Sequence, residues 1–251
     1  PQDTEAAAFF DVDNTLIQGS SLILLAQGLF KKRFITLSEL APALRKQIRY
    51  RVSGSENADD IAEGREQALA IVKGKSVEEL KQACREIVDN RMLQKSYADT
   101  IELASMHLAA GQQVWLVSAT PVQIGQALAE TLGFTGALGT VAEEEDGKFT
   151  GRLVGDILHG PGKKHAVAAL AALQQLDLSK CTAYSDSVND LPMLNMVGSP
   201  VAVNPDRALR KHAKAQGWAV RDYRSVRRVM RAAVVPAVLA AAGLWWWRRR
   251  R

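Results

Sequence analysis

The chain has 251 residues, of which 47% are hydrophobic and 24% are charged, and this is enough to bury a substantial core. The net charge is +5, but residues 221–251 hold nine arginines and one aspartate, so residues 1–220 carry −3. This mildly acidic body does not indicate a nucleic-acid-binding domain, which would present a basic surface, and we expect no nucleic-acid partner. The two cysteines, Cys84 and Cys181, lack the spacing of a metal site and are expected to be reduced thiols. The acidic start of the chain carries no secretory signal, which predicts a cytoplasmic location.

The first part of the chain predicts one buried strand followed by helices. Residues Ala6–Asp11 are apolar up to the final aspartate, as in a strand that is covered on both faces. Ser76 and Glu79 form a capping box, which marks the start of a helix. Four segments have helical spacing of apolar residues: Ser21–Phe30, Leu37–Val52, Asn57–Val72 and Val77–Leu93. We therefore expect residues 17–95 to form an all-helical insert.

The rest of the chain alternates strands with helices. Expected strands are Val114–Val117, Cys181–Tyr184, Val201–Val203 and an edge strand at Ala219–Val220, and Ala137–Val154 reads as a β-hairpin turning at Asp146-Gly147. Expected helices are Ser96–Ala110, one from Thr120-Pro121, Lys163–Leu176, one near Asp190–Met196 and one from Pro205. This alternation predicts an α/β fold with a parallel, Rossmann-like sheet, built from residues 1–16 and 96–228.

Carboxylates follow two of the expected strands. FFDVDNTL places Asp11 and Asp13 at the end of the first strand, and YSDSVNDLPML places Asp186 and Asp190 after another. Sites on parallel sheets lie beyond the carboxyl ends of the strands, so these acids are expected to converge. Four carboxylates would repel one another without a divalent cation, and oxygen ligands favour Mg²⁺. The sequence therefore predicts a magnesium site.

Two further segments suit a phosphate group. Ser118 ends the strand VWLV, and its hydroxyl and the backbone N–H of Ala119 can bind phosphate oxygens. In GPGKKHAV, Lys163 and Lys164 open a helix, where anions already bind, and the residues themselves do not choose between the two lysines. Combined with the acids, these groups predict a phosphoryl-transfer site with a carboxylate nucleophile.

The four segments FFDVDNTL, LVSAT, GPGKK and YSDSVNDLPML resemble, in this order, the motifs of the haloacid dehalogenase (HAD) superfamily. The resemblance covers about residues 6–215 and is closest to the phosphoserine-phosphatase-like branch, subfamily IB. It implies a Mg²⁺-dependent phosphatase in which Asp11 attacks phosphorus and forms an aspartyl-phosphate. Asp13 then protonates the leaving oxygen and later activates water. The superfamily's ion-pumping ATPases carry Thr at the position of Asp13, so Asp13 indicates a phosphatase or a mutase.

The resemblance also assigns the surrounding residues. It implies that the phosphoryl oxygens are held by Ser118, Ala119, Lys163 and, as a further contact, Asn189. It implies that Mg²⁺ is held by Asp11, Asp186 and the backbone carbonyl of Asp13, supported by Asp190. The insert, residues 17–95, would be a cap that closes over the site, and the hairpin, residues 137–154, a small flap.

The residues that would read the substrate depart from the phosphoserine phosphatase pattern. That pattern has a Glu at the position of Ser20 and a cap Arg at the place of Ala68, and Arg65 lies one helical turn away. The first insert helix, SSLILLAQGLF, is apolar instead, which fits either a packed cap or an amphiphilic substrate. These departures disfavour free phosphoserine as the substrate.

The C-terminal segment, residues 229–251, suggests a membrane partner. Its uncharged run, Ala232–Trp247, would be about 24 Å long as a helix, short of the roughly 30 Å hydrocarbon core. Three tryptophans beside four arginines are typical of a membrane interface. We expect this segment to lie on, or anchor the chain to, the anionic inner face of a membrane. The alternative is a helix that packs on the body or between the subunits of an oligomer.

Three functional hypotheses follow. The first is a membrane-associated Mg²⁺ phosphomonoesterase acting on a lysophospholipid phosphate or another amphiphilic monoester. The second is a soluble phosphoserine-phosphatase-like enzyme for small metabolites. The third is a non-catalytic membrane adaptor that reuses the fold.

Overall fold

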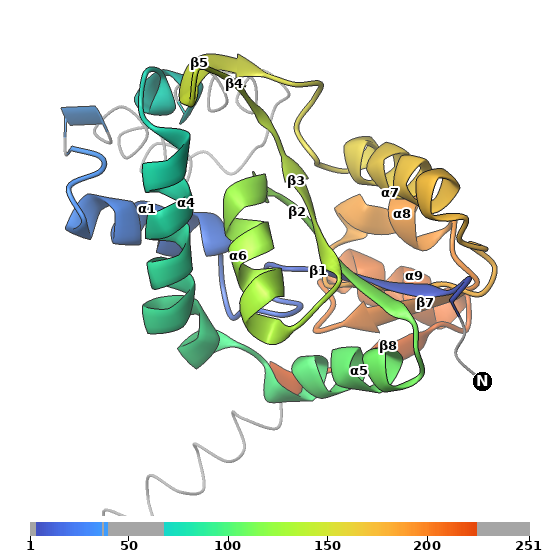
Figure 1. Ribbon diagram of the computed structural model, residues 1–251. Coiled ribbons are helices and arrows are strands. Elements are labelled where there is room, and N and C mark those ends of the chain that lie inside the picture. Colours follow the sequence, from blue (N-terminus) through green and yellow to red (C-terminus); the bar gives the residue numbers. More distant parts are fainter. Residues whose placement is uncertain (1–3, 37, 40–67, 225–251) are drawn as a thin grey trace, which may run out of the picture.

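The computed structural model describes residues 4–36, 38–39 and 68–224 (Figure 1). Most of the expected helix Leu37–Val52, most of Asn57–Val72 and the C-terminal segment 229–251 lie outside these residues. Of the two expected helices, residues 38–39 and 68–72 are described, and these are helical. Within the described part of the chain, no helix has the length and apolar character needed to cross a bilayer.

A six-stranded parallel sheet forms the centre of the fold, with the strand order β3-β2-β1-β6-β7-β8. Its strands are β1 (Ala7–Asp11), β2 (Gln113–Pro121), β3 (Gly136–Thr140), β6 (Thr182–Ser185), β7 (Ser199–Val203) and β8 (Ala219–Arg221). Each of the expected strands is present, and the expected α/β, Rossmann-like fold is confirmed. From β1 the chain winds to one side through β2 and β3, and it later winds to the other side through β6, β7 and β8.

Helices cover both faces of the sheet, which explains why β1 is apolar along its whole length. Ala8 and Phe10 point into one hydrophobic cluster, with α5 (Ala98–Ala109) and α6 (Val122–Leu132). Ala7 and Phe9 point into the other, with α7 (Pro161–Gln174), α8 (Leu191–Leu194) and α9 (Arg207–Ala215). In Figure 1, α6 and α7 stand on opposite sides of the sheet. Every residue of β1 is buried, so its position is fixed from both faces.

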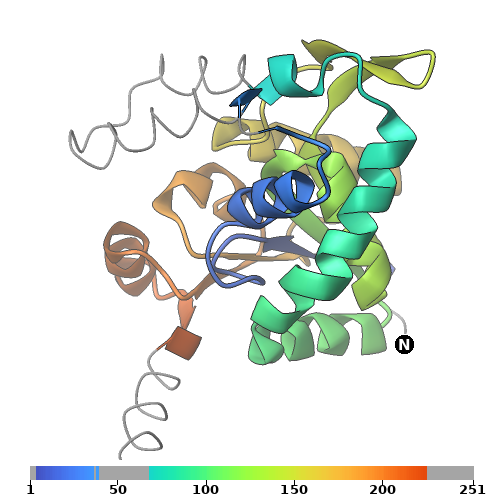
Figure 2. The ribbon, with the colours of Figure 1, turned by 90° about the vertical axis from the view of Figure 1, so that its left-hand side faces the viewer.

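The described part of the insert is helical, as expected. It contains α1 (Ser21–Lys31) and α4 (Val77–Ile87), which is followed by a π-helix (Val88–Met92) and a 3₁₀ turn (Leu93–Lys95). The capping-box serine is confirmed, because the hydroxyl of Ser76 accepts from the backbone N–H of Glu79 at 3.3 Å. Figure 2 shows α1 beside α4. Leu25 of α1 and Leu80 of α4 belong to the same hydrophobic cluster as Leu128 of α6, so these insert helices share the core of the sheet domain.

The expected hairpin Ala137–Val154 is wrong in its first half. Residues 136–140 form β3, which pairs with β2 at the edge of the main sheet. The hairpin itself is shorter and consists of β4 (Ala142–Glu145) and β5 (Lys148–Leu153). The predicted turn is correct, because Asp146 and Gly147 both have positive φ angles, of 50° and 74°, as a two-residue hairpin requires.

The hairpin is bonded to the insert. The N–H of Gly74 donates to the carbonyl of Phe149 at 2.7 Å, and the N–H of Phe149 donates to the carbonyl of Lys75 at 3.1 Å. The N–H of Val77 donates to the carbonyl of Gly147 at 2.9 Å. The hairpin therefore joins the insert just before α4, and its assignment as a flap stays a prediction.

Two asparagines fix the loop that follows β1. Asn14 has a φ of 54°, a conformation that Asn tolerates better than most residues. Asn204, fully buried after β7, donates from its side chain to the carbonyl of Asn14 at 2.9 Å and accepts from the N–H of Tyr223 at 2.8 Å. The ends of three neighbouring segments are thus tied together at one edge of the sheet.

Candidate active site

The expected acids meet where the direction of strand winding reverses. β1 ends with Asp11, and Asp186 directly follows β6, the neighbouring strand. Loops diverge at this point and leave a crevice, where parallel sheets bind their ligands. A pocket of about 230 Å³ lies there. It is lined by all eight residues expected from the sequence: Asp11, Asp13, Ser118, Ala119, Lys163, Asp186, Asn189 and Asp190.

Lys163 is the lysine that enters the pocket. Its Nζ lies 2.6 Å from Oδ1 of Asp11 and 2.8 Å from Oδ2 of Asp190, and the residue is only 4% exposed. Lys164 is exposed. Burial alone would lower the pKa of Lys163, but the charges of Asp11 and Asp190 outweigh it and raise this pKa above its usual value. The ammonium group is therefore held charged beside Asp11.

Asp11 is held at both of its oxygens. Oδ1 accepts from Lys163, and Oδ2 accepts from the hydroxyl of Thr15 at 3.1 Å. Thr15 is itself fully buried, and its carbonyl accepts from the hydroxyl of Thr100 at 2.9 Å. The carboxylate at the end of β1 therefore has a fixed orientation toward the pocket.

The pocket holds more negative charge than one lysine balances. Burial raises the pKa of Asp11 to about 6; Lys163 opposes this shift, whereas Asp190 and Asp13 add to it. Burial, followed by the charges of Asp11 and Asp190, raises the pKa of Asp186 to about 7. Excess negative charge among oxygen donors is the environment in which a divalent cation binds.

The donor set fits Mg²⁺ with two carboxylates and one carbonyl. In residues 4–36, 38–39 and 68–224, no three His, Cys, Asp or Glu side chains gather closely enough to hold a metal ion. The ligands that the family resemblance implies are Asp11, Asp186 and the backbone carbonyl of Asp13. Because this set contains only two carboxylates, it does not require a cluster of three such side chains. The side chain of Asp13 is engaged elsewhere, because its Oδ1 accepts from the N–H of Ser21 at 2.9 Å.

The end of β2 forms one side of the pocket, where the sequence predicts phosphate binding. Pairing between β2 and β3 is interrupted between Val117 and Pro121, so the intervening amides are not committed to this ladder. Ser118 is 5% exposed, and its hydroxyl lies 2.8 Å from that of Thr120 and accepts from the N–H of Thr120 at 3.2 Å. The hydroxyl groups of Ser118 and Thr120, at this interruption of the ladder, suit an anion.

Sequence reasoning missed several lining residues. Thr120 has a local signal, because a hydroxyl residue two positions after Ser118 can bond back to it. His159 lies in the loop before α7 and Ser187 follows Asp186, and neither had a sequence signal of its own. Leu22 of α1 also lines the pocket and is 53% exposed.

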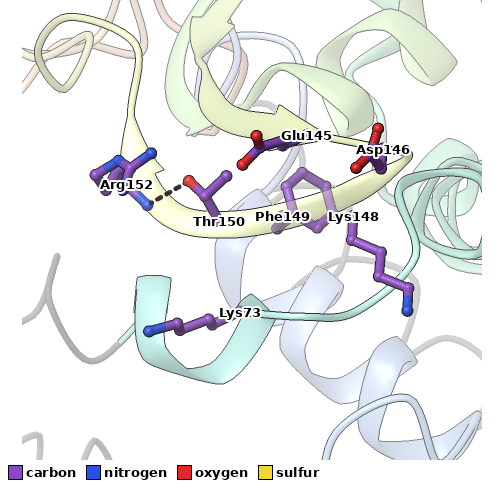
Figure 3. A pocket seen from close by; sticks show the side chains of 7 residues that line it. All are labelled: Lys73, Glu145, Asp146, Lys148, Phe149, Thr150 and Arg152. Atoms are coloured by element: carbon purple, nitrogen blue, oxygen red, sulfur yellow. Dashed lines mark hydrogen bonds between the residues drawn. The ribbon is translucent and has the colours of Figure 1, made fainter.

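A second hollow, of about 530 Å³, lies on the hairpin and not at the acids (Figure 3). Its side chains are Lys73, Glu145, Asp146, Lys148, Phe149, Thr150 and Arg152. Both signs of charge occur here, and none of the residues expected from the motifs takes part. Its greater size therefore does not mark it as the site of chemistry.

The chain is similar to a known family of hydrolases. The family model of haloacid dehalogenase-like hydrolases matches residues 8–195. The chain is 52% identical over 240 residues to phosphoserine phosphatase SerB1 of Mycobacterium tuberculosis H37Rv, covering 96% of this chain and 78% of the relative.

Two solved structures are similar in fold. A Bordetella pertussis Tohama I protein of unknown function matches with a TM-score of 0.76 and 30% identity, covering 87% of this chain and 98% of that one. A substrate-bound phosphoserine phosphatase matches with a TM-score of 0.59 and 19% identity, covering 90% and 97%. At that identity the second likeness concerns the fold alone.

Mg²⁺ should stabilise the protein more at higher pH. The pKa of Asp186 rises from about 4 in the unfolded chain to about 7 in the folded protein. Between these two pH values the folded protein binds the proton more tightly than the unfolded chain does, so the free energy of unfolding falls as pH rises. A cation in the pocket would remove this loss because it favours the ionised form. Thermal unfolding with and without millimolar Mg²⁺ should show a larger increase in Tm near pH 8 than near pH 5. Asp186→Asn should abolish the increase, and an equal increase at both pH values would contradict the assignment.

The two lysines should separate in a binding test. Lys163→Met should weaken binding of inorganic phosphate, measured by calorimetry, at least about tenfold, and it should cost about 3 kcal/mol of stability because two buried carboxylates lose their partner. Lys164→Met, the matched control, should change phosphate binding less than about twofold because this side chain is exposed. The reverse ranking would show that Lys164 is the phosphate-binding lysine.

Proposed function

Because the chain belongs to the haloacid dehalogenase-like hydrolases and is a phosphatase of that family, we propose that it hydrolyses phosphomonoesters through an aspartyl-phosphate on Asp11. The observation that carries this proposal is the buried contact between Asp11 and Lys163 at the carboxyl end of β1. The lysine is a counterion for both the nucleophile and an incoming phosphate. With the family shown and the motif set together in one pocket, the non-catalytic adaptor is not retained.

In the first step, an oxygen of Asp11 forms a bond to phosphorus as the bond from phosphorus to the leaving oxygen breaks. The electron pair goes to the leaving oxygen, and Asp13 supplies the proton that turns it into an alcohol. Thr15 and Lys163 orient the attacking carboxylate, while Ser118 and Lys163 bind the phosphoryl oxygens. The step yields an alcohol and a phosphorylated Asp11.

In the second step, water attacks the phosphorus and Asp13 takes up its proton. The bond between phosphorus and the Asp11 oxygen breaks, which releases inorganic phosphate and restores the carboxylate. Phosphatases of this family generally use Mg²⁺, which would neutralise the carboxylates so that an anionic ester can approach. Asp11, Asp186 and the Asp13 carbonyl would hold it, and Asp190 would support the site through Lys163 and through Ser185, whose hydroxyl donates to it at 2.7 Å.

For the substrate, we propose a small phosphomonoester, with phosphoserine as the first compound to test. A pocket of about 230 Å³ accommodates a phosphate and a short leaving group. The similarity to a protein named phosphoserine phosphatase supports this choice. Ser20 stands where the phosphoserine phosphatase pattern has a Glu that recognises the substrate, and its side chain is uncharged. Its hydroxyl caps α1 by accepting from the backbone N–H of Ile23. Recognition of an amino-acid substrate would then rest on other groups of the pocket.

One observation favours the amphiphilic monoester as a second candidate. Leu22, in the pocket wall, and Ile23, beside it, are 53% and 50% exposed. An apolar leaving group could cover this surface, gaining about 25 cal/mol for each Å² removed from water. The proposed membrane contact of residues 229–251 belongs to this second candidate and lies outside the described residues.

The nucleophile can be tested directly. Asp11→Asn should lower Mg²⁺-dependent hydrolysis of p-nitrophenyl phosphate by about a thousandfold or more, because an amide cannot form the covalent intermediate. Acid-quenched protein should carry phosphate on Asp11. Asp89→Asn, an exposed acid in the π-helix, is the control and should keep full activity. Unlabelled protein, or an Asp11→Asn variant with near-normal turnover, would refute the mechanism.

A substrate panel separates the two candidates. We expect kcat/KM to be higher for phosphoserine than for monomeric lysophosphatidic acid, because the pocket volume matches the smaller ester. Leu22→Ser should then change the phosphoserine value less than about threefold. If lysophosphatidic acid is preferred, and Leu22→Ser lowers its kcat/KM about tenfold, the amphiphilic candidate replaces the first. The full chain and a chain ending at residue 228 should be compared on anionic vesicles.

A further inference from the structure

The carboxylate of Asp13 is held from one side by the start of α1. Its Oδ1 accepts from the backbone N–H of Ser21 at 2.9 Å and also from the hydroxyl of Ser21. Ser21 is only 1% exposed, although it is the first residue of its helix. Both hydrogen bonds of the Asp13 side chain in the described structure end on the same oxygen, so Oδ2 is left for the pocket that Asp13 lines.

Helix capping does not explain the hydroxyl of Ser21. The cap of α1 is Ser20, whose side chain accepts from the N–H of Ile23. The hydroxyl of Ser21 instead donates across a loop of seven residues to Asp13. A serine used only to start the helix would not need this second contact, so the hydroxyl has a function that lies outside the helix.

The place of Ser21 is itself fixed by packing. Leu24, Leu25 and Leu29 anchor α1 in the hydrophobic cluster that also contains Ile87 of α4. A Cβ added to Gly28 would lie 2.4 Å from a side-chain carbon of Ile87, which shows how closely the two helices approach. The hydroxyl that binds Asp13 is therefore carried by a helix whose position is fixed by its packing against α4, another helix of the insert.

We propose that Ser21 is a positioning residue for Asp13, and that its hydroxyl fixes which carboxylate oxygen faces the leaving group. The inference rests on the proposed function, because it needs Asp13 to deliver the proton in the first step. With Oδ1 held by two donors, Oδ2 carries the proton to the leaving oxygen, and the bond from phosphorus to that oxygen can break without forming a free alkoxide. Without the hydroxyl, Asp13 keeps only the backbone donor and can rotate away.

The choice of ester separates this role from a structural one. Loss of proton delivery slows a poor leaving group, such as the alcohol of glycerol 2-phosphate, far more than p-nitrophenolate, which departs without a proton. The quantity to compare is kcat/KM, because it covers only the steps up to loss of the leaving group. A general loss of structure would lower kcat/KM for both esters by the same factor.

In Ser21→Ala, kcat/KM for glycerol 2-phosphate should fall about 10- to 30-fold, and that for p-nitrophenyl phosphate less than about threefold. Ser21→Thr, which keeps the hydroxyl, should restore both values to within about threefold. Ser76→Ala is the matched control, because it removes a serine hydroxyl from the start of α4, away from Asp13, and should leave the ratio of the two esters unchanged.

The outcomes keep the two proposals apart. If the native protein hydrolyses neither ester with Mg²⁺, the proposed function fails. If the native protein is active and Ser21→Ala lowers both esters equally, or neither, the function stands and the role of Ser21 is refuted. Should Ser21→Ala not fold, Ser21→Cys, of nearly equal volume and with a weak donor, takes its place, and an unchanged ratio of the two esters would again refute it.

Discussion

The site depends on one buried ammonium group among several carboxylates. Lys163 contacts Asp11 and Asp190 at 2.6 and 2.8 Å, and all three residues are at most 6% exposed. Burial of such charges is costly unless they are paired, so the geometry of these strand ends and of the start of α7 is coupled. The pairing is incomplete, because Asp186 adds a further acid whose pKa is raised to about 7. In a pocket with this excess of negative charge, a bound divalent cation would reduce the repulsion between the carboxylates and an anionic phosphate.

Much of this arrangement could be predicted from the sequence, because strand ends are easily read. Apolar runs that stop at Asp11, Ser118 and near Asp186 mark three strands, and parallel topology brings their ends to one edge. The choice between Lys163 and Lys164 required the structure. Successive helical residues point about 100° apart, and only the observed start of α7 at Pro161 shows which lysine faces the pocket.

The errors have equally local causes. The hairpin predicted for Ala137–Val154 wrongly includes residues 137–140, because Asp146-Gly147 is a strong turn signal and the prediction extends the first hairpin strand too far toward the N-terminus. In the structure β3 pairs with β2 in the main sheet, whereas β4, which begins after Val141, pairs with β5 in the hairpin. The segment predicted to be one strand is therefore two strands in two different sheets. Two of the missed pocket residues, His159 and Ser187, lie in loops, where a side chain's direction depends on loop geometry that periodicity does not encode. The third, Thr120, lies near the end of β2, where the pairing with β3 is interrupted.

The two sides of the pocket have different origins. The sheet domain carries the residues proposed to bind the phosphate, at the ends of β1, β2 and β6 and at the start of α7, and the strands are fixed in position because both faces of the sheet are covered. The insert contributes α1, which brings Leu22 into the pocket wall, on the proposed side of the leaving group, and brings Ser21 to Asp13. Because α1 packs in the same hydrophobic cluster as α6, the proposed proton donor, Asp13, and the proposed nucleophile, Asp11, are held by one continuous core. Substitutions on the apolar face of α1 can therefore change the substrate preference only if they leave the contact between Ser21 and Asp13 in place. In this proposal, substrate specificity and the chemical step are coupled through α1.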